Sequence, residues 1–146
     1  MKKILTLMVA LLFVAGAASA RDRVSRNVAD LPAQAQATLQ QHFRGVAVNH
    51  IKIDKGSFGK VDYEVVLNNG TEIDFNKDGS LKEVNCGTRS VPAALIPASI
   101  RDYVSGNYSG QNIVTFEINR NNYEVQLANG TELKFDRAGN FLKVDY

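Results

Sequence analysis

The stretch that decides the fold is Tyr-Glu-Val-Val-Leu-Asn-Asn-Gly-Thr-Glu at residues 63–72, which returns as Tyr-Glu-Val-Gln-Leu-Ala-Asn-Gly-Thr-Glu at residues 123–132. Of the 22 positions from 63 to 84, 11 are identical to the residue 60 positions later. Upstream, similar residues recur at an offset of 65, so the first copy has the longer loop before position 62. Self-similarity of this kind indicates a duplicated unit. The predicted copies are 30–86 and 91–146, within one domain at 30–146.

Each copy shows the pattern of a small antiparallel sheet. In the first copy Tyr63, Val65 and Leu67 alternate with polar residues, apart from Val66, as in a half-buried strand. Asn69-Gly70 and Asn129-Gly130 predict two-residue type I′ turns, in which both central residues take positive φ. Further strands are expected near 51–53, 73–75 and 81–86, with counterparts in the second copy. Whether the two sheets join into one is left open by these patterns.

A helix is expected at the start of each copy. Pro32 and Pro97 suit a first helical turn, where a missing N–H costs nothing. The apolar residues that follow fall on one face, four positions apart, for example Ala35 and Leu39 in the first copy. The predicted fold class is therefore α+β, a tandem duplication of a unit with one helix and four antiparallel strands.

The first twenty residues have the features of a secretory signal peptide. Lys2 and Lys3 precede an apolar run, and Ala18-Ser19-Ala20 is a small-residue cleavage site. Residues 1–20 are predicted to be removed, residues 21–29 form a lead-in, and the product is periplasmic or secreted, with no membrane span after cleavage. Without the two leader lysines, 17 basic residues become 15, equal to the 15 acidic ones. A neutral chain is not expected to bind nucleic acid.

The chain has a single cysteine, Cys86. One cysteine excludes an intramolecular disulfide and a cysteine-based zinc cluster. Cys86 lies two residues after Val84 on a predicted strand, so both side chains share one face. The position predicts a small buried hydrophobic residue.

The two Tyr-Glu-Val-x-Leu-x-Asn-Gly-Thr-Glu segments, the Leu/Ile-Pro helix starts and the leader together resemble the PepSY-like family of exported Bacteroides-type proteins, which are named for their likeness to a β-lactamase inhibitor. The resemblance covers nearly all of the chain after the leader. It implies the tandem fold of the β-lactamase inhibitor protein, and PepSY domains more broadly are linked to restraint of peptidases. A shared fold by itself does not carry a function across.

The hairpin tips are the candidate partner-binding residues. The longer first-copy loop contains Lys55, Phe58 and Lys60, and the second copy closes the equivalent hairpin with Arg120 and Asn121. A Phe flanked by Gly and Lys residues at a loop tip can enter a partner's pocket, or it can fold back on its own sheet. Resemblance to the inhibitor implies the first use, because a hairpin of that inhibitor enters the active site of its target enzyme.

Asp74, Asn76 and Asp78 match the opening of a calcium-binding loop. The bidentate Glu that completes such a loop is replaced by Asn85, and the flanking pattern is strand-turn-strand. The simpler interpretation is a strand that runs into an Asp-Gly turn. These three residues form the alternative metal site, and no cofactor is predicted.

No catalytic motif for a serine nucleophile, a phosphate loop or a zinc protease is present in the sequence. Glu64 and Glu72 could meet across their hairpin, but the repeat of this pair as Glu124 and Glu132 suggests a shared sheet surface. The favoured function is an exported non-catalytic binding module for a protein or peptide, such as a peptidase inhibitor. The alternative is an envelope module that binds calcium or a small ligand in the groove between the helices and the sheet.

Overall fold

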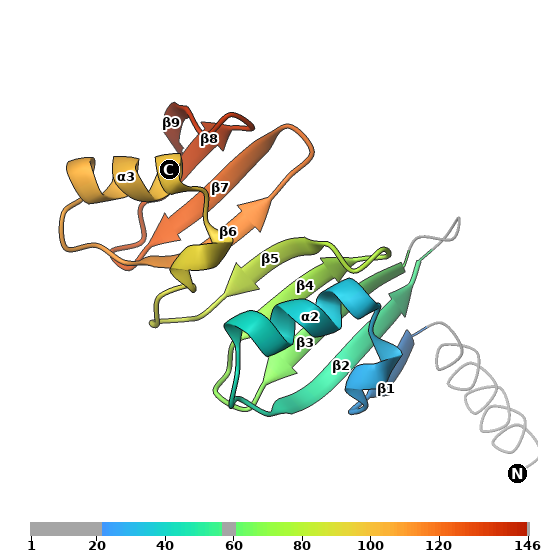
Figure 1. The fold of residues 1–146 in the computed structure, drawn as a ribbon. Coiled ribbons are helices and arrows are strands. Elements are labelled where there is room, and N and C mark those ends of the chain that lie inside the picture. The colour runs from blue at the N-terminus through green and yellow to red at the C-terminus, as the bar shows by residue number, and fades with distance from the viewer. Residues whose placement is uncertain (1–21, 57–60, 146) are drawn as a thin grey trace, which may run out of the picture.

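A computed structural model describes residues 22–56 and 61–145, so the predicted leader at 1–20 lies outside the described residues. The nine strands form one antiparallel sheet in chain order (Figure 1). The strands are β1 (Asp22–Ser25), β2 (Val48–Lys55), β3 (Val61–Leu67), β4 (Glu72–Asn76), β5 (Leu81–Asn85), β6 (Ile113–Ile118), β7 (Asn122–Leu127), β8 (Glu132–Asp136) and β9 (Phe141–Asp145). The helices are η1 (Val28–Asp30), α2 (Ala33–His42), η3 (Ala93–Leu95) and α3 (Ala98–Asn107).

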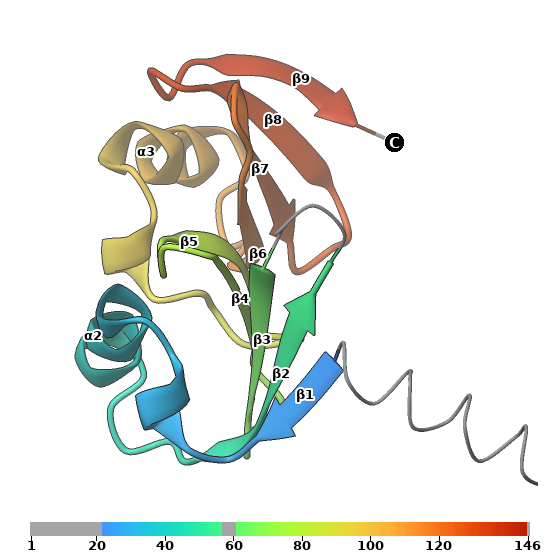
Figure 2. The same ribbon diagram turned by 90° about the vertical axis from the view of Figure 1, so that its right-hand side faces the viewer.

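Both α-helices lie on the same face of the sheet, which curves around them (Figure 2). Their apolar stripes are buried as expected, with Ala35 and Leu39 of α2 and Val104 of α3 all at most 8% exposed. Beneath the helices, Phe75, Phe116 and Phe135 are fully buried. The helices are ten residues each and marginal alone, so this packing stabilises them. Cys86 is 4% exposed, which confirms its predicted burial.

The predicted fold class is wrong. The structure is mostly β, a single nine-stranded sheet with two short helices, and not an α+β pair of units with four strands each. The predicted lead-in supplies an additional strand, β1, which pairs with β2. The sheet is continuous because β5 pairs with β6 through Glu83–Glu117, Val84–Phe116 and Asn85–Thr115. Neither pairing could be read from periodicity, since both join segments without a tight turn between them.

The hairpin turns also differ from expectation. The amide of Gly70 donates to the carbonyl of Leu67 at 3.0 Å, so Asn68 and Asn69 are the central residues and Gly70 follows them with φ of +84°. This is the three-residue hairpin in which a glycine in the left-handed region follows the turn. The Asn129-Gly130 turn has the same hydrogen bond, from Gly130 to Leu127 at 2.9 Å. In both hairpins the glycine with positive φ therefore follows the two central residues of the turn and is not one of them.

Candidate functional site

The face of the sheet opposite the helices is open and polar. Period-2 alternation sends every second strand residue to this face, where the side chains of Glu64, Asp74, Glu83 and Glu117 are all only partly exposed. Their strand neighbours, such as Val65 and Val84, point to the helices and are buried. The open face is therefore the one large surface of the described sheet that no helix covers (Figure 2).

Five carboxylates lie in one line across the middle of this face. Each is the direct cross-strand partner of the next, from β3 to β7. We call this line the acidic row, and its members are Glu64, Asp74, Glu83, Glu117 and Glu124. Directly opposed like charges destabilise a sheet. The stability of the sheet therefore does not explain why five carboxylates lie in one line.

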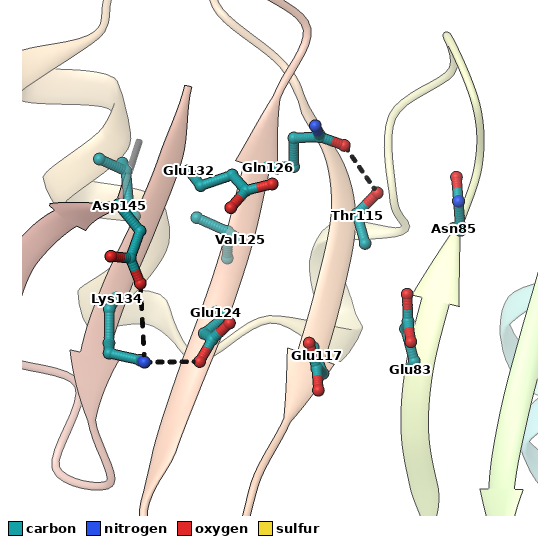
Figure 3. Close-up of a pocket in the computed structure, with 11 residues that line it drawn as sticks. Glu83, Asn85, Thr115, Glu117, Glu124, Val125, Gln126, Glu132, Lys134 and Asp145 are labelled. Atoms are coloured by element: carbon teal, nitrogen blue, oxygen red, sulfur yellow. Dashed lines mark hydrogen bonds and ion pairs between the residues drawn. The ribbon is translucent and has the colours of Figure 1, made fainter. Parts of the chain in front are cut away.

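Lysines close the acidic row at both ends. Lys52 is the register partner of Glu64, and its Nζ lies 2.7 Å from Glu64 Oε1. Lys134 is the partner of Glu124, with Nζ 2.9 Å from Glu124 Oε1 and 3.7 Å from Asp145 Oδ2. Figure 3 shows Lys134 between these two carboxylates. The two ends of the row are thereby neutralised.

The middle of the row is not neutralised in the same way. Among the described residues, Asp74, Glu83 and Glu117 have no salt bridge within 4 Å. Burial, followed by the charge of Glu64, raises the pKa of Asp74 above its usual value, although Lys82 opposes this. Burial and then the charge of Glu117 raise the pKa of Glu83. The middle of the row therefore favours a proton or another cation.

Shallow hollows lie along the acidic row. One of about 310 Å³ is lined by Glu83, Glu117, Glu124 and Lys134 among others (Figure 3). Another, of about 350 Å³, lies at the β1 side against Lys52 and further residues. A small hollow of about 110 Å³ between them contains Glu64, Glu72, Asp74, Glu83 and Asn85. The small hollow shares Glu83 with the first and Glu64 and Asp74 with the second, so carboxylates line all three.

The predicted hairpin-tip residues lie at one end of the sheet. Antiparallel alternation places the β2–β3 and β6–β7 connections at the same end, and Lys55, Arg120 and Asn121 are exposed there. Phe58 and Lys60 lie outside the described residues. The structure therefore brings three of the five residues to the same end of the sheet. They lie near the ends of the strands, whereas the acidic row crosses the middle of the strands.

The three residues of the predicted calcium loop have different partners. Asp74 lies in the acidic row, whereas Asn76 donates to Ser80 Oγ at 3.0 Å. Asp78 accepts from the amide and the hydroxyl of Ser80, at 2.9 and 2.6 Å, and these bonds lower its pKa. Among the described residues, no group of three or more His, Cys, Asp or Glu side chains is placed to hold a metal ion. Asp78 acts here as a turn residue.

Other expected pairs are also separated. Glu64 is opposite Asp74, and Glu72 is opposite Val66, so the two glutamates share a hollow without being direct partners. Where the small-ligand hypothesis expects a groove between the helices and the sheet, the structure has open hollows near the ends of the helices. One of about 560 Å³ contains Phe43, and one of about 310 Å³ contains Tyr108.

Sequence reasoning missed the acidic row as a unit, and Glu83 and Glu117 in particular. The available signal was that each acid occupies a polar position of a period-2 strand. Alternation identifies the face of a residue but not its register against a distant strand. The pairing of Glu83 with Glu117 therefore became visible only in the assembled sheet.

A protein-family model described as "Putative beta-lactamase-inhibitor-like, PepSY-like" matches residues 61–143. A crystal structure of a "putative periplasmic protein of unknown function" from Bacteroides vulgatus is 41% identical, with a TM-score of 0.82, and covers 86% of this chain and 99% of its own. A "putative calcium-regulated periplasmic protein" from Bacteroides thetaiotaomicron is 38% identical, with a TM-score of 0.81 and coverage of 86% and 97%. No curated protein is a significant match.

These relatives agree with two expectations from the sequence. Their descriptions as periplasmic proteins confirm the predicted periplasmic location. In the part of the chain that the structure describes, no helix is long and apolar enough to cross a membrane. The family match extends over more than half of the chain and confirms the predicted resemblance. The chain belongs to the PepSY-like family.

Proposed function

We propose that this periplasmic protein is a non-catalytic binding module whose open sheet face takes a positively charged segment of a protein or peptide. The observation that carries the proposal is the acidic row, with Asp74, Glu83 and Glu117 unneutralised at its centre. A cationic segment would supply the charges that the sheet itself places only at the two ends of the row. If the partner is an enzyme, occupation of this face would make the module an inhibitor.

The length of the acidic row supports an extended partner. Neighbouring strands are about 4.8 Å apart, so the four steps from Glu64 to Glu124 span roughly 19 Å. An extended peptide of about six residues has this length. The three hollows follow one another along the row, which suits a chain better than a compact small molecule. Lys55, Arg120 and Asn121 lie at the strand ends, off the line of the row, and would contact only a partner larger than the peptide segment.

The test compares two fluorescent peptides of eight residues, one rich in lysine and one with glutamine in place of each lysine. Fluorescence anisotropy at low salt is expected to show binding of the lysine peptide only. Glu83→Gln combined with Glu117→Gln is expected to weaken binding about fivefold to tenfold, since exposed charge pairs contribute up to about 1 kcal/mol each. Added salt is expected to weaken it further.

The matched control is Asp102→Asn, which removes one negative charge from the exposed side of α3, on the other face of the sheet. This variant is expected to bind like the unmodified protein. Equal affinity for the two peptides, or an equal effect of the control and the double variant, would rule out the acidic row as the binding surface.

Calcium is a second candidate, favoured by the description of the Bacteroides thetaiotaomicron relative as calcium-regulated. Calcium takes six to eight oxygen ligands, and the acidic row is rich in carboxylate oxygens. The carboxylates would have to turn toward a common point, because no group of three is placed for a metal among the described residues.

Calorimetry with calcium chloride separates the two possible calcium sites. Asp74→Asn is expected to reduce binding at the acidic row, and Asp78→Asn is expected to leave it unchanged, because Asp78 lies in the turn. Loss of binding in the Asp78 variant would instead favour the loop of Asp74, Asn76 and Asp78. No heat at millimolar calcium would eliminate this candidate.

A further inference from the structure

The pairing of β5 with β6 is the shortest in the described sheet. It has three register pairs, whereas every other neighbouring pair of strands has at least four. It is also the only link in the described sheet between the β1–β5 and β6–β9 parts (Figure 1). We call this pairing, with its three register pairs, the joint. Its stability decides whether the two parts behave as one sheet.

The joint has opposite character on its two faces. Toward the helices, Val84 and Phe116 are direct partners and both are fully buried. Toward the open face, Glu83 and Glu117 are direct partners (Figure 3). Apolar contact on one side therefore holds together strands that like charges push apart on the other.

The charges around this pair do not relieve the repulsion. Asp74 faces Glu83 from β4, with Glu72 nearby on the same strand, and Glu124 faces Glu117 from β7. Lys82, next to Glu83 on β5, lowers the pKa of Glu83, but less than burial and the acids raise it. Lys52 on β2 and Lys134 on β8 lie at the two ends of the row, away from the joint, and each is bonded to an outer acid. Within the described residues, acids thus outnumber the bases that face the joint.

We propose that the joint is a pH-responsive element, loosened at neutral pH by the opposed Glu83 and Glu117 and tightened when Glu83 takes up a proton and donates a hydrogen bond to the carboxylate of Glu117. A protonated carboxyl donates a hydrogen bond to a neighbouring carboxylate, which turns the repulsive pair into a bonded one. The raised pKa of Glu83 has the direction that this requires. The inference needs no partner and is independent of the proposed peptide binding.

The sign follows from proton linkage. A glutamate whose pKa is higher in the closed joint than in the open joint binds more protons when the joint is closed. Closure is therefore favoured as the pH falls from neutral toward the usual glutamate value of about 4.3. The effect is largest at the joint, because the opposed pair lies there and not within either part of the sheet.

Amide hydrogen exchange measured by NMR tests the joint directly. Beside the ladder of the joint, two backbone hydrogen bonds connect the segment just after β5 to β6, from Cys86 N–H to Val114 O at 2.9 Å and from Val91 N–H to Ile113 O at 2.8 Å. The protection factors of these two amides, corrected for intrinsic exchange, are expected to rise about twofold to fivefold from pH 7 to pH 5, as expected for loss of a cross-strand repulsion of up to about 1 kcal/mol. Reference amides are Asn68, bonded to Ala47 O, and Ala128, bonded to Asn112 O.

The variant Glu83→Gln combined with Glu117→Gln is expected to show the higher protection already at pH 7, with no further rise at pH 5. Glu132→Gln is the matched control, because it removes a negative charge from the same face at a position opposite Gln126, away from the joint. The proposal is overturned if protection at Cys86 and Val91 does not depend on pH. It is also overturned if the reference amides change equally, or if the control acts like the double variant.

Discussion

Tyr103 of α3 stacks on Phe141 of β9, with ring centroids 4.5 Å apart and an interplanar angle of 11°. Tyr103 also meets Phe135 of β8 edge to face at 5.4 Å. Because β9 is an edge strand with β8 as its one neighbour in the described sheet, this aromatic contact ties the edge to the helix. Such ring pairs contribute about 0.5–1.5 kcal/mol beyond the area they bury.

Phe141→Ala is expected to lower the free energy of unfolding by about 2–3 kcal/mol, somewhat less than for a fully buried Phe because Phe141 is partly exposed. Urea denaturation followed by circular dichroism measures this change. The control is Leu142→Ala on the same strand, where the side chain is 53% exposed, and the expected change is within about 0.5 kcal/mol. Similar losses in the two variants would show that the stack does not stabilise β9.

Gly79 lies in the β4–β5 turn with φ of +86°, directly against the start of α2. A Cβ at this position would lie 2.7 Å from Pro32 Cβ and 3.1 Å from the amide nitrogen of Ala35. Gly70 has nearly the same φ, +84°, but its Cβ would meet nothing within 4 Å. An alanine would therefore meet the same backbone strain at both positions, but it would have free space only at position 70.

Gly70→Ala is expected to cost about 1–2 kcal/mol from the left-handed backbone alone. Gly79→Ala is expected to cost about 1–3 kcal/mol more, because overpacking forces α2 to move. The difference between their urea midpoints measures the closeness of the turn to the helix. Equal midpoints would mean that the turn does not need to approach α2.

Thr71 is a buried polar residue, 1% exposed, whose Oγ1 accepts from Arg89 Nη2 at 3.2 Å. Arg89 Nη2 also donates to the carbonyl of Asn69 at 2.6 Å, so the arginine holds the β3–β4 turn. Thr131 occupies the corresponding position of the β7–β8 turn and is partly exposed.

Thr71→Val is expected to lower the free energy of unfolding by about 1–2 kcal/mol, because buried hydrogen-bonding groups lose their partner. Thr131→Val is expected to change it by less than about 0.5 kcal/mol at a more exposed position. Thermal unfolding of the two variants side by side measures the contrast. A larger loss at Thr131 would contradict the role of Arg89.

The stability of the whole chain is expected to vary with pH in two stages. Asp74 and Glu83 have a raised pKa in the folded state, so the folded state binds more protons and stability rises as the pH falls from neutral toward about 5. Hydrogen bonds from Ser25 and Ser80 lower the pKa of Asp30 and Asp78, and that contribution is lost as the pH falls below the unfolded aspartate value of about 3.9. Urea midpoints at pH 7, 5 and 3 are expected to peak at the middle value.

Asp74→Asn is expected to raise the midpoint at pH 7 and to reduce the gain at pH 5, because it removes one of the two acids responsible. Asp102→Asn is the control, with an exposed acid on α3. A midpoint for the unmodified protein that falls steadily from pH 7 would contradict the first stage.

Much of the local structure could be predicted from particular residues. The alternation around Tyr63 and Val65 predicted a strand, and the apolar spacing of Ala35 and Leu39 predicted the buried face of a helix. The strand β1 was not predicted, because Asp22 and Arg23 make its residues read as polar and it is held by pairing with β2. Sequence patterns show the preferences of nearby residues. A strand such as β1, which is stabilised by pairing with β2, has no such pattern.

The sequence by itself determined the strands after β1, the two α-helices, the burial of Cys86 and the PepSY-like resemblance, because these depend on residues close together in the chain. Only the tertiary structure decided that the sheet is continuous and that five acids form one row. Glu83 and Glu117 are 34 residues apart, and no tight turn sets the register between their strands. That register is set by the packing of Val84 and Phe116 beneath the helices, which brings the two carboxylates face to face on the other side of the sheet.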